Sequence, residues 1–327
     1  MLDRRTAIAA SLAAPLVLAT RARAQGSRRP LVIIVGAPPG GTADGVGRVL
    51  AEAMRGELGG TVVVENRGGG SGLEAAERLV RAEPDGQTLL MANTSVLAIN
   101  PSLYPRLTYD PLRDFGFVGK VATVPIVLAV RRELGVNSVQ ELIALAKSRP
   151  GTLNFGSAGT ATAMHLAGVL FNQMAGTEIT HVPFRGSAPA VTNLIGGQGL
   201  DMMFEPAATL LQYIANGTLV ALAVADGQRA AALPDVPTMS EAGLTGYVAT
   251  QYFGLVAPAA TPAATLNQLS ETMARGLGSP ATRDRLKSIG AEPAASSPAA
   301  LRQFVAEEIP HWRELVRISG AKLDGGG

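Results

Sequence analysis

"VIIVGAPPGGTADGVGRVLAEAM", residues 32–54, joins an apolar run through a turn rich in glycine and proline to an amphipathic segment. This pattern is typical of a strand, a tight turn and a helix N-terminus. The N–H groups of a first helical turn have no partner inside the helix, so such a turn can bind an anion. The turn lacks both the P-loop lysine and the G-x-G-x-x-G spacing of nucleotide sites, so the anion must be of another kind. A plain strand-to-helix connection would use the same glycines for tightness.

The first 24 residues have the composition of an export signal. Arg4 and Arg5 precede an apolar run over 7–19, and Ala22-Arg23-Ala24 has the small-x-small pattern of a cleavage site. The run is too short for a membrane span. The arginine pair fits the twin-arginine route as well as the general secretory route. We therefore expect a periplasmic protein that is exported by a cleavable signal, residues 1–24.

Charge and cysteine content exclude several classes of function. The chain has 28 basic and 26 acidic residues, and four of the basic and one of the acidic residues fall within 1–24, so the remainder carries a net charge of −1. The sequence pI of 9.1 therefore reflects the signal, and we expect no nucleic-acid partner. The absence of cysteine excludes disulfides and thiol chemistry. No His, Asp and Glu residues have the spacing of metal ligands, so we expect neither a metal nor a cofactor.

Strand-like runs alternate with helix-like segments along most of the chain, which predicts an α/β fold with parallel or mixed sheets. A second glycine turn, "FGSAGTAT" at 155–162, repeats the pattern about 120 residues after the first. Ligands of open α/β sheets bind at the carboxyl ends of the strands. The repeat therefore predicts two similar lobes whose glycine turns point into one cleft.

Two long β-rich runs, 115–130 and 246–259, are the candidate crossings between these lobes. We expect a first lobe from residues 25–124, a second lobe from 125–247, and a return to the first lobe over 248–327. The tail is expected to hold two helices. The last helix should begin at Ser297 as its N-cap, with Pro298 in the first helical position.

The first turn offers backbone donors to an anion. Gly40, Gly41 and Thr42 can donate N–H groups, with the helix dipole behind them. Asp44 falls in the first helical turn. There a carboxylate can cap N–H groups, and a role facing a ligand ammonium or hydroxyl is the alternative.

The second turn offers hydroxyl groups as well as backbone donors. Ser157, Gly159 and Thr160 precede a helix, and Ser157 is also a conceivable nucleophile. The hydrolase pattern G-x-S-x-G does not fit "FGSAG" in register, and neither His165 nor His181 has the spacing of a catalytic triad. A hydrolase using Ser157 is therefore an alternative with little support.

Polar residues end three further strand-like runs. "ANTS" at 92–95 and "FEP" at 204–206 are ordinary turns by default, but in a two-lobed protein both would line the cleft. Arg185 follows the run "HVPF". Its guanidinium fits either a surface ion pair or a cleft cation that binds a carboxylate.

The chain resembles the periplasmic substrate-binding proteins of tripartite tricarboxylate transporters, also called the Bordetella uptake gene (Bug) family. The stretches that carry the resemblance span nearly the whole chain after the signal: "APPGGTAD", "VVVENRGGGSG", "EPDGQTLLMANTSVLAINPSLY", "YDPLRDFGFVG", "ELIALAKSRPGTLNFGSAGTATAMHLAG", "HVPFRGSAPAVTNLIGGQ" and "LPDVPTMSEAGLTGY". The resemblance implies a type II periplasmic-binding-protein fold, a venus-flytrap of two doubly wound α/β lobes joined by two crossover strands. It also implies a small organic anion, often a carboxylate, held between the two glycine loops.

Carried over position by position, the first loop of the family matches 37–42, the second-lobe loop matches 157–160, and the "TS" after the third strand matches 94–95. The chain departs from the usual family pattern at Gly36-Ala37, at Arg185, and at Glu205-Pro206 in a slightly longer stretch. The predicted ligand-binding residues are Ala37, Pro38, Gly40, Gly41, Thr42, Asp44, Thr94, Ser95, Ser157, Ala158, Gly159, Thr160, Arg185 and Glu205.

The sequence thus predicts a non-catalytic, monomeric binding protein for a small organic acid. Its partners would be the membrane components of a tripartite tricarboxylate transporter. Two alternatives remain open at this point: an exported α/β hydrolase, and a sensory module that reports ligand binding to a membrane kinase.

Overall fold

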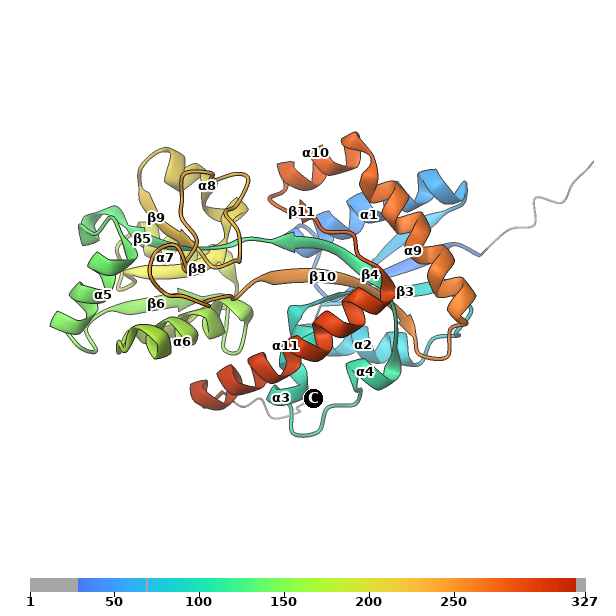
Figure 1. The fold of residues 1–327 in the computed structure, drawn as a ribbon, viewed down its shortest axis with the longest axis horizontal. Helices are drawn as coiled ribbons and strands as arrows, with labels where there is room; N and C mark the ends of the chain where they lie inside the picture. The colour runs from blue at the N-terminus through green and yellow to red at the C-terminus, as the bar shows by residue number, and fades with distance from the viewer. Residues whose placement is uncertain (1–28, 69, 322–327) are drawn as a thin grey trace, which may run out of the picture.

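The computed structural model describes residues 29–68 and 70–321, so the expected export signal lies outside the described residues. Their secondary structure forms two β-sheets, each covered by helices (Figure 1). Among the helices of these residues, none is long and apolar enough to cross a membrane.

The first sheet has six strands in the order β11-β4-β10-β3-β1-β2. Its strands are β1 (Leu31–Val35), β2 (Val62–Asn66), β3 (Thr88–Asn93), β4 (Phe115–Val124), β10 (Gln251–Pro258) and β11 (Glu292–Pro293). Strand β1 pairs in parallel with β2 and β3, and Ile33 lies opposite Val64 and Leu89. Strand β10 is antiparallel to both β3 and β4, so β3 and β4 run in the same direction.

The second sheet has five strands in the order β7-β6-β8-β5-β9. Its strands are β5 (Ile126–Arg131), β6 (Asn154–Ser157), β7 (Thr180–Pro183), β8 (Met202–Pro206) and β9 (Leu219–Val224). Strand β6 pairs in parallel with β7 and β8, whereas β5 is antiparallel to β8 and β9.

Helices cover both faces of each sheet. The helices are α1 (Thr42–Leu58), α2 (Leu73–Val80), α3 (Asn100–Leu103), α4 (Pro111–Asp114), α5 (Val139–Ser148), α6 (Ala163–Ala175), α7 (Ser187–Ile195), α8 (Ala207–Ala215), α9 (Ala263–Gly278), α10 (Pro280–Ser288) and α11 (Pro298–Ser319), with the helical turns η1 (Gly70–Gly72), η2 (Ser95–Ile99) and η3 (Arg132–Leu134). One apolar cluster joins α1, α9 and α10 to the first sheet, and another joins α7 and α8 to the second. A third, larger cluster joins α2, η2, α6 and α11 to the remaining faces.

The chain crosses from one sheet to the other at Pro125, which is the single residue between β4 and β5. It returns after β9 through 225–250 and enters β10 at Gln251. Both crossings therefore fall within or beside the two β-rich runs of the sequence, although only 251–258 of the second run is a strand. The boundary residues predicted for the two lobes stay a prediction.

The C-terminal tail differs from the two helices expected. It contains α9, α10 and α11, together with the short strand β11 at the edge of the first sheet. The sequence pattern missed α10 because only Thr282 and Leu286 of its nine residues are buried, so it shows no apolar stripe. Ser297 caps α11 as predicted, since its hydroxyl accepts a hydrogen bond from Ala300 N–H at 3.2 Å.

Helix α11 packs on β4, η2 and α3 of the first lobe and on α6 of the second. Its buried Trp312 and Leu315 belong to the same apolar cluster as Phe155 and Phe171, which lie in the second lobe. The C-terminal helix thus ties the two lobes together through one continuous core.

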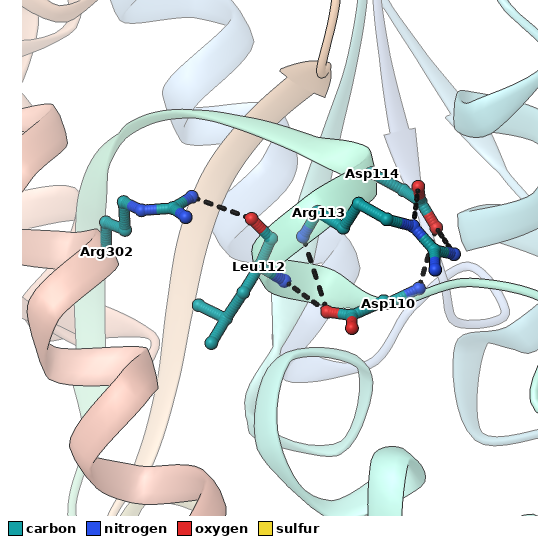
Figure 2. A network of polar contacts seen from close by, with 5 residues as sticks. All are labelled: Asp110, Leu112, Arg113, Asp114 and Arg302. Atoms are coloured by element: carbon teal, nitrogen blue, oxygen red, sulfur yellow. Dashed lines mark hydrogen bonds and ion pairs between the residues drawn. The ribbon is translucent and has the colours of Figure 1, made fainter.

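A polar network fixes the start of β4 against α11 (Figure 2). Asp110 caps α4 by accepting hydrogen bonds from Leu112 N–H at 2.9 Å and Arg113 N–H at 3.3 Å. The Arg113 guanidinium holds both oxygens of Asp114 at 2.8 Å, and Arg302 of α11 donates to the Leu112 carbonyl at 2.8 Å. The strand that crosses to the second lobe therefore leaves from an anchored turn.

Candidate functional site

The carboxyl ends of the parallel strands in both sheets lie at the boundary between the lobes. Strand β4 runs parallel to β3 and ends at Val124, next to the crossing, so β1, β2 and β3 also end at this edge. In the second sheet, Pro206 at the end of β8 pairs with Ile126 at the start of β5, so β6, β7 and β8 end there as well. The loops that carry the predicted site residues therefore leave the two sheets toward one another, as ligand sites of α/β sheets require.

The first loop exposes unpaired backbone donors. Gly41 is the N-cap of α1 and makes no capping hydrogen bond through a side chain. Within the described residues, the N–H groups of Gly41, Thr42 and Ala43 have no hydrogen-bond partner. Gly40, Gly41 and Thr42 line a cavity of about 250 Å³, and Ile289 forms its opposite wall. This arrangement leaves the positive end of the α1 dipole open to an anion.

Asp44 does not cap these donors, because its carboxylate is turned back into the loop. Oδ2 accepts hydrogen bonds from Arg48 Nε at 2.9 Å and from Gly40 N–H at 3.0 Å, and Oδ1 accepts one from Asn66 Nδ2 at 2.9 Å. The hydrogen bond from Arg48 is the main cause that lowers the pKa of Asp44 to about 2, against the opposing effect of burial. The N–H group of Gly40, predicted as a ligand donor, is thus engaged by Asp44.

Asn66 is a residue of the site that the sequence did not reveal. The Asn66 side chain donates one hydrogen bond to Asp44 and another, at 3.1 Å, to the Ala37 carbonyl. It therefore contacts both ends of the first loop. An asparagine at the end of a strand is an ordinary turn residue, so nothing in the local pattern marked it. The same segment supports the prolines, because a Cβ on Gly68 would lie 2.8 Å from Cδ of Pro38.

Thr94 is buried and ties β3 to β10. Its hydroxyl oxygen accepts a hydrogen bond from Tyr252 N–H at 3.0 Å. Ser95 follows it as the first residue of the π-helical turn η2. The hydroxyl of Thr94 is therefore used inside the fold, at the strand that returns from the second lobe. The predicted ligand contacts of Thr94 and Ser95 stay predictions.

The second loop is built around Ser157, whose side chain is fully buried at the end of β6. Its Oγ accepts a hydrogen bond from Gly159 N–H at 3.2 Å and lies 2.7 Å from Nε2 of His181. Thr162 caps α6 by accepting a hydrogen bond from His165 N–H at 3.3 Å. The described residues provide no hydrogen-bond partner for the N–H groups of Ala158 and Thr160, so these two donors of the loop stay available.

The contact between Ser157 and His181 was missed because it depends on strand register. Phe155 lies opposite His181 in the β6–β7 pair, so His181 shares a face of the sheet with the side chain two residues further along β6. The His181 ring is tilted by 30° against that of His165, with 3.9 Å between the ring centroids. Burial lowers the pKa of both to about 4, and the proximity of His181 adds to this for His165. His181 is thus a base within hydrogen-bond distance of Ser157. The serine is fully buried, however, so its hydroxyl is not exposed to an ester substrate.

Arg185 is exposed, and within the described residues it makes no hydrogen bond or ion pair. The surface ion pair considered for it is therefore not formed. Its neighbour Gly186 donates an N–H to the Ala158 carbonyl at 3.1 Å, which joins the Arg185 loop to the second glycine loop. The guanidinium is free to pair with an anion at this edge.

Glu205 lies at the end of β8 with only 1% of its surface exposed. Burial raises the pKa of its carboxyl to about 7, against the opposing hydrogen bonds of Ser187 and Thr209. These partners belong to the first turns of α7 and α8, so the carboxyl lies between two helix N-termini. Its Oε2 has no hydrogen-bond partner among the described residues.

The structure brings part of the predicted set together. Gly40, Gly41, Thr42 and Asp44 line one cavity, whereas 157–160 and Arg185 lie across the boundary on the second lobe and do not line it. The two halves of the predicted site are therefore separate surfaces on opposing lobes.

Comparison with known proteins identifies the family. A family model described as "Tripartite tricarboxylate transporter family receptor" matches residues 46–320. Protein BugT of Bordetella pertussis is 37% identical over 297 residues, which cover 90% of this chain and 90% of BugT.

Solved structures agree with the sequence comparison. Rpa4515 of R. palustris, solved with adipate, is 34% identical with a TM-score of 0.80, covering 90% of this chain and 98% of its own. MatC of Rhodopseudomonas palustris, solved with bound malate, is 31% identical with a TM-score of 0.75, covering 88% and 98%. The predicted fold, two α/β lobes joined by two crossover strands, is thereby confirmed.

The matched family is one of transporter receptors, and these relatives are substrate-binding proteins rather than enzymes. The hydrolase alternative, which the burial of Ser157 already weakens, has no support among them. The chain is therefore a substrate-binding protein of the tripartite tricarboxylate transporter receptor family.

Proposed function

We propose that this chain captures a small organic acid between its two lobes and presents it to the membrane components of a tripartite tricarboxylate transporter. The observation that carries the proposal is the row of N–H groups at Gly41, Thr42 and Ala43, which have no partner among the described residues and lie beside a cavity lined by Gly41 and Thr42. The adipate and malate bound to the two related structures support a carboxylate as the anion.

Neither lobe alone is expected to bind the acid tightly. A helix dipole contributes about 0.3–1 kcal/mol to binding a charge when exposed. A hydrogen bond to a charged group contributes about 1.5–3 kcal/mol. The donors of the first loop and those of Ala158 and Thr160 in the second must therefore act on one ligand together. A carboxylate suits such neutral donors, because it needs no metal to neutralise its charge.

The remaining parts of the proposal concern export and assembly. We propose that the signal, residues 1–24, is cleaved on export, that the mature protein is a monomer, and that the lobes divide near 124 and 248. The alanine-rich end of the signal and the crossings at Pro125 and before Gln251 support this. N-terminal sequencing of the periplasmic protein tests the cleavage.

A thermal-shift panel of dicarboxylates, tricarboxylates, amino acids and aromatic acids tests the function. At about one hundred times its dissociation constant, a ligand stabilises the folded state by about 2.7 kcal/mol, which a melting curve resolves. A panel in which no organic acid raises the melting temperature would contradict the proposal.

The first prediction concerns Gly41. Its Cβ position is open, with nothing within 4 Å, so Gly41→Val should fold normally while placing a side chain where the anion approaches. We expect the affinity for the acid found in the panel to fall at least about tenfold, or 1.4 kcal/mol, by calorimetry. The matched control is Gly60→Val, which is equally unobstructed and lies between α1 and β2. Equal binding by both variants would place the anion elsewhere.

The second prediction concerns Arg185. If the ligand carries a second carboxylate, Arg185→Ala should weaken its binding, while a monocarboxylate of the same length binds as before. Arg106→Ala removes another exposed arginine that makes no ion pair within the described residues, and it should change neither affinity. If Arg185→Ala binds the dicarboxylate as tightly as the wild type does, Arg185 is a surface residue that does not contact the ligand.

The third prediction concerns Asp44, which we propose to hold the loop in shape. Its folded pKa of about 2 lies below its usual value, so its ionised form stabilises the fold above about pH 4, and this contribution is lost as the pH falls toward 2. Urea unfolding should therefore show Asp44→Asn to be less stable than the wild type at pH 7, with a smaller difference at pH 3. Asp235→Asn, at an exposed position, serves as the control. A difference that does not change with pH would refute this role.

A further inference from the structure

The turn that follows α10 and the first residue of β11, together Ile289–Glu292, lie where the two lobes meet. Gly290 packs against Ala208, the second residue of α8, so closely that a Cβ on Gly290 would lie 2.0 Å from Cβ and 3.0 Å from Cα of Ala208. Two residues further, Oε1 of Glu292 accepts a hydrogen bond from Ala231 N–H at 2.9 Å. Figure 1 shows α10 and β11 on the side of the first lobe that is turned toward the second. One turn of the first lobe thus contacts two segments of the second.

The same turn also contacts the anion loop. Ile289 lines the cavity formed by Gly40, Gly41 and Thr42, and its Cδ1 lies 3.1 Å from where a Cβ on Gly45 would be. On the other side of the turn, 290–292 line a second cavity of about 230 Å³. Its remaining walls are Pro125, Ala207, Ala230, Ala231, Ala232 and Lys287. The turn therefore connects the α1 N-terminus to the second lobe by direct contact.

We propose that Gly290 and Glu292 are positioning residues for ligand binding. The turn, which we call the latch (Ile289–Glu292), holds α8 and 230–232 of the second lobe at the separation where both glycine loops reach one ligand. The consequence for affinity rests on the proposed function, whereas the positioning of the lobes needs no ligand. Neither residue belongs to the set predicted to touch the acid.

A glycine is required at the contact for two reasons. Gly290 has a φ of +70°, a conformation that residues with a Cβ adopt at a cost, and Ala208 leaves no space for a side chain. A side chain here would push α8 away and favour separated lobes. Only molecules whose lobes are close enough for both loops to reach one ligand can bind it, so the apparent affinity is the intrinsic affinity multiplied by the fraction of such molecules. If that fraction falls from one half to one tenth, the apparent affinity falls about fivefold.

Distance measurements in the ligand-free protein test the latch. The chain has no native cysteine, so spin labels can be attached at Gln212→Cys on α8 and Arg283→Cys on α10, both exposed positions. In Gly290→Ala, double electron–electron resonance should show the distance distribution moving to longer values. An organic acid that binds the wild type in the thermal-shift panel should bind Gly290→Ala more weakly. The loss is about fivefold if the fraction of molecules with close lobes falls from one half to one tenth.

Two controls separate positioning from backbone strain. Gly151→Ala pays the same conformational cost, since Gly151 also has a φ of +70°, but nothing lies within 4 Å of its Cβ position, so its distances should match the wild type. Ala208→Gly combined with Gly290→Ala removes the contact at 2.0 Å and should shift the distribution back toward the wild type. Identical distributions for Gly290→Ala and Gly151→Ala would overturn the latch.

Glu292 provides a second test that does not depend on the fold of Gly290→Ala. Glu292→Ala loses the acceptor for Ala231 N–H and should lengthen the distances, by less than Gly290→Ala. Glu292→Gln keeps an acceptor oxygen and should retain the wild-type distribution. Equal distances in both Glu292 variants and the wild type would remove this residue from the latch. If no acid in the thermal-shift panel binds, the proposed function is refuted. The distance measurements are made without ligand, so they still test the latch.

Discussion

The first turn of α1 can receive an anion because the carboxylate that could cap it is held elsewhere. Gly41 has no side chain to offer as an N-cap, and Asp44 is bound by Arg48, Asn66 and the N–H group of Gly40. A serine or aspartate at position 41 could accept a hydrogen bond from Ala43 N–H and so remove one of the open donors. The loop thus combines an ordered shape with unpaired N–H groups, and the rest of the fold places this loop at the lobe boundary.

Strand direction brings the two halves of the proposed site to facing edges of the lobes. Pro125 is the only residue between β4 and β5, so the carboxyl edges of the two sheets face each other across a very short connection. Each edge carries a helix N-terminus and a few N–H donors without a partner among the described residues, and in the proposed function both sets are needed to bind one acid. The proposal therefore couples binding to the approach of the lobes. The latch at 289–292 and the packing of α11 on both lobes are the contacts that set this approach.

Burial decides the chemistry of the second loop. A serine with a histidine nitrogen at 2.7 Å has the geometry of an activated nucleophile, but here the serine is fully buried. Burial also lowers the pKa of His181 to about 4, so the ring is neutral and acts as a hydrogen-bonding support for the loop. Ser157 and His181, which by type suggest catalysis, thus support the loop that carries the N–H donors of Ala158 and Thr160.

The sequence by itself determined the elements whose signals are local. The 3.6-residue periodicity of α1, the serine cap of α11, and the glycine turn before α1 follow from residues within a few positions of one another. Tertiary structure decided the pairs that build the site. Asn66 and Asp44 are 22 residues apart, Ser157 and His181 are 24, and Tyr252 and Thr94 are 158. Such contacts depend on sheet order and strand register, which bring distant residues together and which no local pattern of hydrophobicity contains.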